Sequence, residues 1–127
     1  MFYIVDSDKS PDEAADALES AVRRHDFGVL HVHDLKATLE SKGFEFPGAC
    51  KIFEVCNPKQ AVGVLGSDMT LNMALPCRIS VYQDGGQTKI GMIRPAAMLS
   101  KLSEVPELKS IAAQVEAETI AMIDEAK

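Results

Sequence analysis

The stretch Cys77–Ile93, CRISVYQDGGQTKIGMI, decides the fold class, because it holds two strand-like runs on either side of a tight-turn signal. The turn is Asp84-Gly85-Gly86, and glycine tolerates the positive φ angles that tight hairpins require. The flanking runs, Cys77–Gln83 and Gln87–Ile93, contain β-branched and aromatic residues that favour strands. We therefore expect an antiparallel β-hairpin in the second half of the chain.

The rest of the chain alternates between strand-like and helix-like patterns. Strand-like runs precede the hairpin at residues 2–6, 27–33 and 49–55. Apolar residues recur at helical spacing at residues 11–25, 34–42, 58–65, 95–102 and from 106 onward. Gly66 is expected to end the third of these helices, and residues 67–74 are expected to form a loop. The last helix has the strongest stripe, formed by Leu108, Ile111, Ala112, Val115, Thr119, Met122 and Ile123.

This order of elements predicts a single α+β domain over residues 1–127, with a mostly antiparallel sheet of about five strands and helices packed on one face. The other face of the sheet would carry Val29, His31, Ile52 or Phe53, and Ile79 or Val81, depending on the register. Such a face is too apolar to be left bare in water. We therefore expect a homodimer in which a second copy covers it.

Composition excludes several classes of function. The chain has 127 residues, 46% hydrophobic and 25% charged, which is ordinary for one globular domain. Its net charge of −6 provides no basic footprint for nucleic acid or for an anionic membrane surface. It contains no apolar run of transmembrane length and no signal-peptide pattern at its N-terminus. Its three cysteines are an odd number for a disulfide framework, so we expect reduced thiols and a cytoplasmic location.

Two proline-bearing motifs carry a family resemblance. They are Ile52–Pro58 (IFEVCNP) and Leu75–Tyr82 (LPCRISVY), and the earlier Phe27–Leu30 (FGVL) followed by Asp34-Leu35 agrees with them. With these motifs the chain resembles the bacterial and archaeal domain-of-unknown-function family 302 over nearly its whole length. The resemblance implies a TATA-binding-protein-like α+β arrangement and a dimer. It implies no activity, and a fold of this kind does not itself imply DNA binding.

Cys56 and Cys77 are the candidate catalytic thiols. Cys56 ends a strand directly before a helix N-terminus, where the helix dipole favours a thiolate. Cys77 begins the fourth strand and would approach Cys56 if the third and fourth strands are neighbours, which would suit a redox pair or a metal site. A small buried residue at a strand end explains Cys56 more simply than a reactive thiol does. Cys50 lies about 20 Å from Cys56 along a strand, too far to share an ion with it.

The remaining candidate site residues are polar. His31 and His33, two apart on a strand, would project from one face about 7 Å apart, together with Val29 and opposite Leu30 and Val32. They would give two ligands to a metal, with a third from Glu54 or a cysteine, or else form a polar surface. Glu54, in an apolar strand, is a candidate general base whose pKa burial would raise.

Arginine and asparagine complete the candidate set. Arg78 and Arg94 flank the hairpin, and either is able to pair with Glu54 or with an anionic ligand. Asn57 is a candidate ligand-binding residue, although an N-cap role explains it more simply. Met69, Met73, Met92 and Met98 are explained by core filling or by a soft apolar pocket.

No phosphate loop, nucleophile elbow or zinc-protease motif occurs. The sequence therefore favours a homodimeric small-molecule or ion-binding module. The alternatives are a thiol-dependent enzyme or redox protein that uses Cys56 with Cys77, and a transition-metal or sulfur-handling protein. The ligand and any cofactor stay open.

Overall fold

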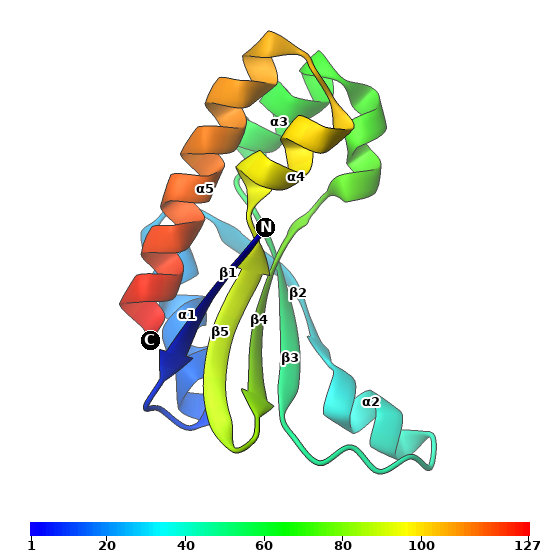
Figure 1. Cartoon of the computed structure of the whole chain (residues 1–127), viewed down its shortest axis with the longest axis vertical. Coiled ribbons are helices and arrows are strands. Elements are labelled where there is room, and N and C mark those ends of the chain that lie inside the picture. Colours follow the sequence, from blue (N-terminus) through cyan, green and yellow to red (C-terminus); the bar gives the residue numbers. More distant parts are fainter.

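Five β-strands form one antiparallel sheet in the computed structural model, which describes all 127 residues. The strands are β1 (Phe2–Ser7), β2 (Gly28–Asp34), β3 (Cys50–Cys56), β4 (Cys77–Asp84) and β5 (Gln87–Ile93). Their order across the sheet is β1-β5-β4-β3-β2, with every neighbouring pair antiparallel (Figure 1). The expected α+β class and five-stranded antiparallel sheet are therefore confirmed.

The hairpin of β4 and β5 forms as its turn signal predicts. The two strands pair from Asp84↔Gln87 to Ser80↔Gly91. Gly85 and Gly86 have φ angles of +58° and +84°, the left-handed region that residues with a Cβ rarely adopt.

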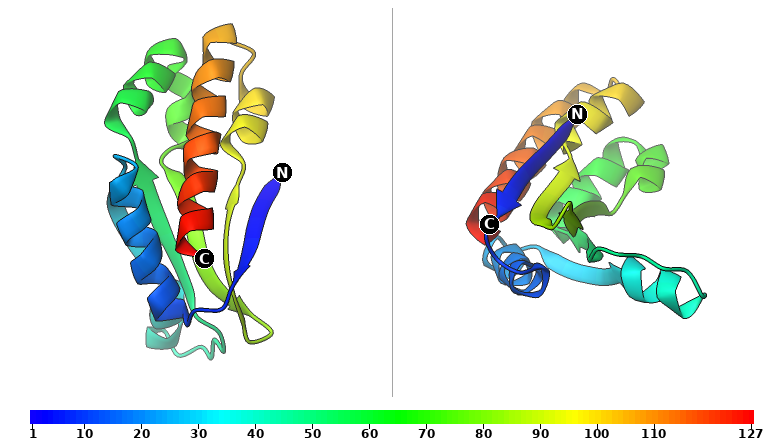
Figure 2. Two further views of the ribbon diagram at one scale, coloured as in Figure 1. Left: turned by 90° about the vertical axis from the view of Figure 1, so that its left-hand side faces the viewer. Right: turned by 60° about the horizontal axis from the view of Figure 1, so that its bottom comes forward.

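Two long helices, α1 (Pro11–Arg24) and α5 (Pro106–Ala126), lie side by side over one face of the sheet (Figure 2). The hydroxyl of Ser10 caps α1 by accepting a hydrogen bond of 3.2 Å from the Glu13 backbone N–H. The expected stripe of α5 is buried apart from Ile111, which is partly buried. No helix of the chain is both long enough and apolar enough to cross a membrane.

The four shorter helices lie at the ends of the sheet rather than over that face (Figures 1 and 2). They are α2 (Leu35–Ser41), α3 (Pro58–Ser67), the 3₁₀-helix η1 (Met69–Ala74) and α4 (Pro95–Leu102). Figure 1 shows α3, η1 and α4 beyond one end of the sheet and α2 projecting from the other end. A second, smaller core of Val64, Leu71, Leu99, Leu108 and Ala112 joins the cluster of α3, η1 and α4 to α5.

Two local predictions in this part of the chain are wrong. Gly66 does not end α3, which runs on to Ser67, because the Ser67 hydroxyl donates to the Gly63 carbonyl oxygen and Asp68 starts a new cap. The region from Met69 to Ala74 is helical rather than a loop, because the Asp68 carboxylate accepts from the Thr70 N–H and Leu71 is buried in the smaller core.

The second face of the sheet is left uncovered by helices (Figure 2). We call it the open face, and its residues, by strand register, are Phe2, Ile4, Asp6, His31, His33, Cys50, Ile52, Glu54, Arg78, Ser80, Tyr82, Asp84, Gln87, Lys89, Gly91 and Ile93. The expected exposure of Val29 on this face is wrong, because the register shifts between Val29 and His31. Leu30 forms the irregularity, so Val29 and Val32 share the face that the helices cover. Phe53, Ile79 and Val81 are buried on that covered face.

Candidate functional site

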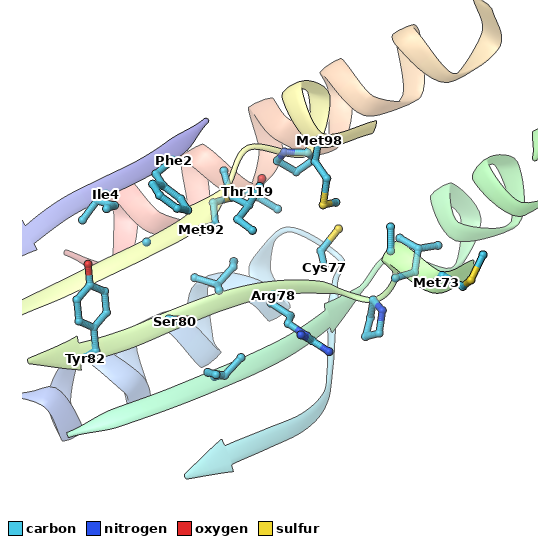
Figure 3. Close-up of a pocket in the computed structure, with 18 residues that line it drawn as sticks. Phe2, Ile4, Met73, Cys77, Arg78, Ser80, Tyr82, Met92, Met98 and Thr119 are labelled. Carbon is cyan, nitrogen blue, oxygen red and sulfur yellow. The ribbon is translucent and has the colours of Figure 1, made fainter. Parts of the chain in front are cut away.

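The sheet opens between β4 and β5. Their pairing stops at Ser80↔Gly91, whereas β4 continues along β3 as far as Val55↔Cys77 and β5 continues along β1 as far as Phe2↔Ile93. The two strands therefore diverge toward the cluster of α3, η1 and α4, as Figure 1 shows. We call this opening the β4–β5 split. It holds a pocket of about 570 Å³, the larger of two that concern the candidate residues (Figure 3).

Most of this pocket is apolar. Phe2, Ile4 and Ile93 line it from β1 and β5, and Met73 and Met98 line it from η1 and α4. Figure 3 shows the side chains of Cys77 and Met98 directed toward each other across the split. Methionine side chains adapt to irregular shapes, so this end of the pocket accepts more than one outline of ligand.

The inner end of the pocket reaches the long helix. Thr119 of α5 lines the pocket, and its hydroxyl already donates to the Val115 carbonyl oxygen at 2.8 Å. Gly91 supplies no side chain at the point where β5 borders the split. A Cβ there would lie 3.0 Å from Ile4 Cγ1, so glycine allows Ile4 to fold over the strand.

A polar edge borders the pocket along β4. Arg78, Ser80 and Tyr82 alternate along this strand and so share the open face (Figure 3). The Arg78 side chain is exposed at the rim, where it extends toward β3. The lining is thus apolar on the side of β1 and β5 and polar on the side of β4.

The expected pairing of Glu54 with an arginine does not occur. Glu54 lies opposite Arg78 in the register, but Glu54 Oε1 is 2.7 Å from His33 Nε2. Arg94 instead has its guanidinium carbon 5.6 Å from the centre of the Tyr3 ring, a cation–π distance.

His31 and His33 share the open face, as predicted, with ring centroids 4.4 Å apart and edge-on. With the His33–Glu54 bond they form a polar cluster on β2 and β3. No group of three histidine, cysteine or acidic side chains is arranged to hold a metal ion. The third ligand that the metal hypothesis needs is therefore missing from the arrangement.

A second pocket of about 310 Å³ lies on the other side of the Leu75–Cys77 segment. Cys56 and Asn57 line it from the end of β3, and Leu75, Pro76 and Cys77 line both pockets. The segment between the two pockets contains a cis peptide bond at Leu75–Pro76. The two proline-bearing motifs therefore meet at one place in the fold.

Cys56 and Cys77 do come together, because β3 and β4 are neighbours. Val55 pairs with Cys77, which makes Cys56 a diagonal neighbour, and both thiols line the second pocket. Burial raises the pKa of the Cys77 thiol to about 11, and the nearby Cys56 adds to the rise. Cys77 is therefore almost fully protonated at neutral pH, which is the opposite of what a thiolate nucleophile requires.

Cys50 and Asn57 lie outside the contact between Cys56 and Cys77. Cys50 lies at the opposite end of β3, across from Tyr82, and burial followed by the Asp34 carboxylate raises the pKa of its thiol. Asn57 Oδ1 accepts from the Gln60 backbone N–H at 3.1 Å, so its side chain is the N-cap of α3.

Several pocket residues carried no sign of a binding role in the sequence. Ser80 and Tyr82 were visible only as alternate residues of a strand, and Phe2, Ile4 and Thr119 come from distant parts of the chain. The methionines were anticipated in part, since Met73, Met92 and Met98 line the pocket and Met69 does not.

Comparisons with known proteins identify a family and solved structures of the same fold. The family model described as "Domain of unknown function DUF302" matches residues 3–126. A crystal structure of an uncharacterized conserved protein DUF302 from Bacillus stearothermophilus is 36% identical, with a TM-score of 0.93 over 99% of this chain and 98% of that one. No curated protein matches at a significant level.

Proposed function

Because the chain belongs to the DUF302 family, whose description assigns no activity, we propose a function from its geometry: it binds a small, largely apolar molecule in the β4–β5 split. The observation that carries this proposal is the pocket itself. A sheet that parts between two paired strands loses backbone hydrogen bonds, each worth about 1 kcal/mol of stability. We infer that a bound ligand offsets this loss.

The size and lining of the pocket support a small-molecule ligand. Pockets for such ligands usually measure about 300–1,000 Å³ and combine apolar walls with a few polar groups. The β4–β5 split has about 570 Å³, with 12 of its 18 lining residues hydrophobic. A free ion would gain little from apolar walls. We therefore favour a small-molecule ligand over an ion.

We propose further that a second copy of the chain covers the open face. Phe2, Ile4 and Ile93 are 64%, 48% and 46% exposed, and they form a contiguous apolar edge beside the pocket. A homodimer through this edge would bury these side chains and roof the pocket.

The thiol-enzyme alternative is less favoured. Its two thiols are close, but the raised pKa of Cys77 opposes nucleophilic chemistry at that residue.

Binding of the neutral fluorophore N-phenyl-1-naphthylamine tests the proposal. Its emission increases in apolar surroundings, and the chain contains no tryptophan to interfere. We expect saturable binding by the wild type and loss of at least tenfold in affinity in Ser80→Phe, because the new ring would occupy the pocket from its partly exposed rim.

Asp6→Phe is the matched control, because it adds the same ring to the same sheet face at an exposed residue outside the pocket. It should bind the fluorophore as the wild type does. Equal binding by Ser80→Phe and the wild type would refute the proposed site.

A further inference from the structure

Arg78 is the one cation that lines the β4–β5 split, and it has no partner within the chain. None of its guanidinium N–H groups takes part in a hydrogen bond or an ion pair within the chain. Its guanidinium stays charged at any physiological pH and offers a planar fork of donors. An unpaired arginine at the rim of an apolar pocket points to a ligand that supplies the missing anion.

Each acidic residue of the open face is either paired with another side chain or far from Arg78. Glu54, directly opposite Arg78, is bonded to His33 at 2.7 Å. Asp6 pairs with Lys89 at 2.7 Å, and Lys89 lies opposite Tyr82, four residues along β4 from Arg78. Asp84 is six residues from Arg78 on the same strand, about 20 Å away.

The polar groups beside Arg78 have matching chemistry. Ser80 and Tyr82 follow on the same face of β4, and both carry hydroxyl donors for which no partner occurs in the chain. Three polar residues of one strand, Arg78, Ser80 and Tyr82, therefore line the β4 side of the pocket. The opposite side presents Phe2 and Ile93.

We propose that the ligand of the β4–β5 split is an amphipathic organic acid, whose anionic group binds Arg78 and whose apolar body lies against β1, β5 and α4. This inference rests on the proposed small-molecule function and specifies its ligand class. Arginine suits an oxyanion such as a carboxylate or sulfonate, because its fork matches two oxygens at once. Because the Glu54 carboxylate is bonded to His33, it does not occupy the guanidinium donors of Arg78.

Two fluorophores with one skeleton separate the anionic part of this proposal from the apolar part. N-phenyl-1-naphthylamine is neutral, and 8-anilino-1-naphthalenesulfonate is the same molecule with a sulfonate. Dissociation constants for both are measured with the wild type, Arg78→Gln, Arg78→Lys and Lys89→Gln. The last variant is the control, because it removes a positive charge from the same sheet face outside the pocket.

In Arg78→Gln, we expect the sulfonate to bind about tenfold more weakly, the effect of losing one charge-assisted hydrogen-bonded pair at a partly solvated site. The neutral fluorophore should change less than twofold. Arg78→Lys should lie between, and Lys89→Gln should bind both as the wild type does. Arg78 is exposed, so its variants should keep the wild-type thermal unfolding midpoint.

The outcomes distinguish this inference from the function on which it rests. Unchanged sulfonate binding in Arg78→Gln, or an equal loss for both fluorophores, would overturn the anionic ligand while leaving an apolar pocket. Failure of both fluorophores to bind the wild type saturably would overturn the pocket and the inference together.

Discussion

Cys77 should be alkylated about a hundredfold more slowly than an ordinary thiol at pH 8. Its pKa is raised from 9.0 to about 11, chiefly by burial. At pH 8 the thiolate fraction is about one in ten for a pKa of 9 and about one in a thousand for a pKa of 11, and only the thiolate reacts. Limited access for the reagent slows the reaction further.

Site-resolved mass spectrometry after brief exposure to iodoacetamide, from pH 7 to pH 11, measures this rate for Cys77 by itself. The same tryptic peptide, alkylated in urea, supplies the unperturbed thiol. We expect the native rate to keep rising toward pH 11. A midpoint near pH 9, or equal native and unfolded rates at pH 8, would refute the reasoning that burial protects this thiol.

The same shift has a consequence for stability. As the pH rises, the unfolded chain loses the Cys77 proton first, so the stabilising contribution is complete below about pH 9 and declines through about pH 11. Two pKa units correspond to about 3 kcal/mol at the alkaline limit. Urea unfolding of the wild type and of Cys77→Ala at several pH values should therefore show a smaller alkaline loss in the variant, and parallel curves would contradict it.

Three further predictions concern packing, capping and assembly. Leu18→Ala should lower the free energy of unfolding by about 2–5 kcal/mol in urea titrations, because Leu18 is fully buried in the main core; a change below about 1 kcal/mol would contradict that placement. Asn57→Ala should cost about 1 kcal/mol of stability by removing the cap of α3 while leaving fluorophore binding unchanged, and a loss of binding without a loss of stability would show a ligand-binding role instead. Multi-angle light scattering at micromolar concentration should give a dimer for the wild type and a monomer for Ile4→Glu, whose charge would lie in the covered edge; a monomeric wild type would remove the dimer proposal.

Local chemistry explains the parts of the fold that the sequence predicts well. The hairpin turn depends on Gly85 and Gly86, whose positive φ angles are a property of single residues. The N-terminus of α3 depends on Asn57 and the following proline. The stripe of α5 repeats over 21 residues, so chance alternatives are few.

Non-local pairing explains the parts that the sequence does not predict. The strand order is set by which apolar faces meet across the whole chain, and no short motif specifies it. One irregularity at Leu30 reverses the face of Val29, which strict alternation along the strand cannot anticipate.

The candidate site was predictable only as single residues. His31, His33, Glu54 and Arg78 were identified, but the partner of Glu54 depends on the registers of β2, β3 and β4 together. The pocket requires β4 and β5 to stop pairing at Ser80↔Gly91, on the side away from the turn, within the clearest hairpin of the chain. A sequence pattern indicates that two strands pair and not where their pairing stops.

The most direct test of the account is a crystal structure of the protein with 8-anilino-1-naphthalenesulfonate bound. We expect the naphthalene ring inside the β4–β5 split, against Ile93 and Met98, with a sulfonate oxygen within about 3 Å of the Arg78 guanidinium. A ring bound elsewhere on the molecule, with the split empty, would contradict it.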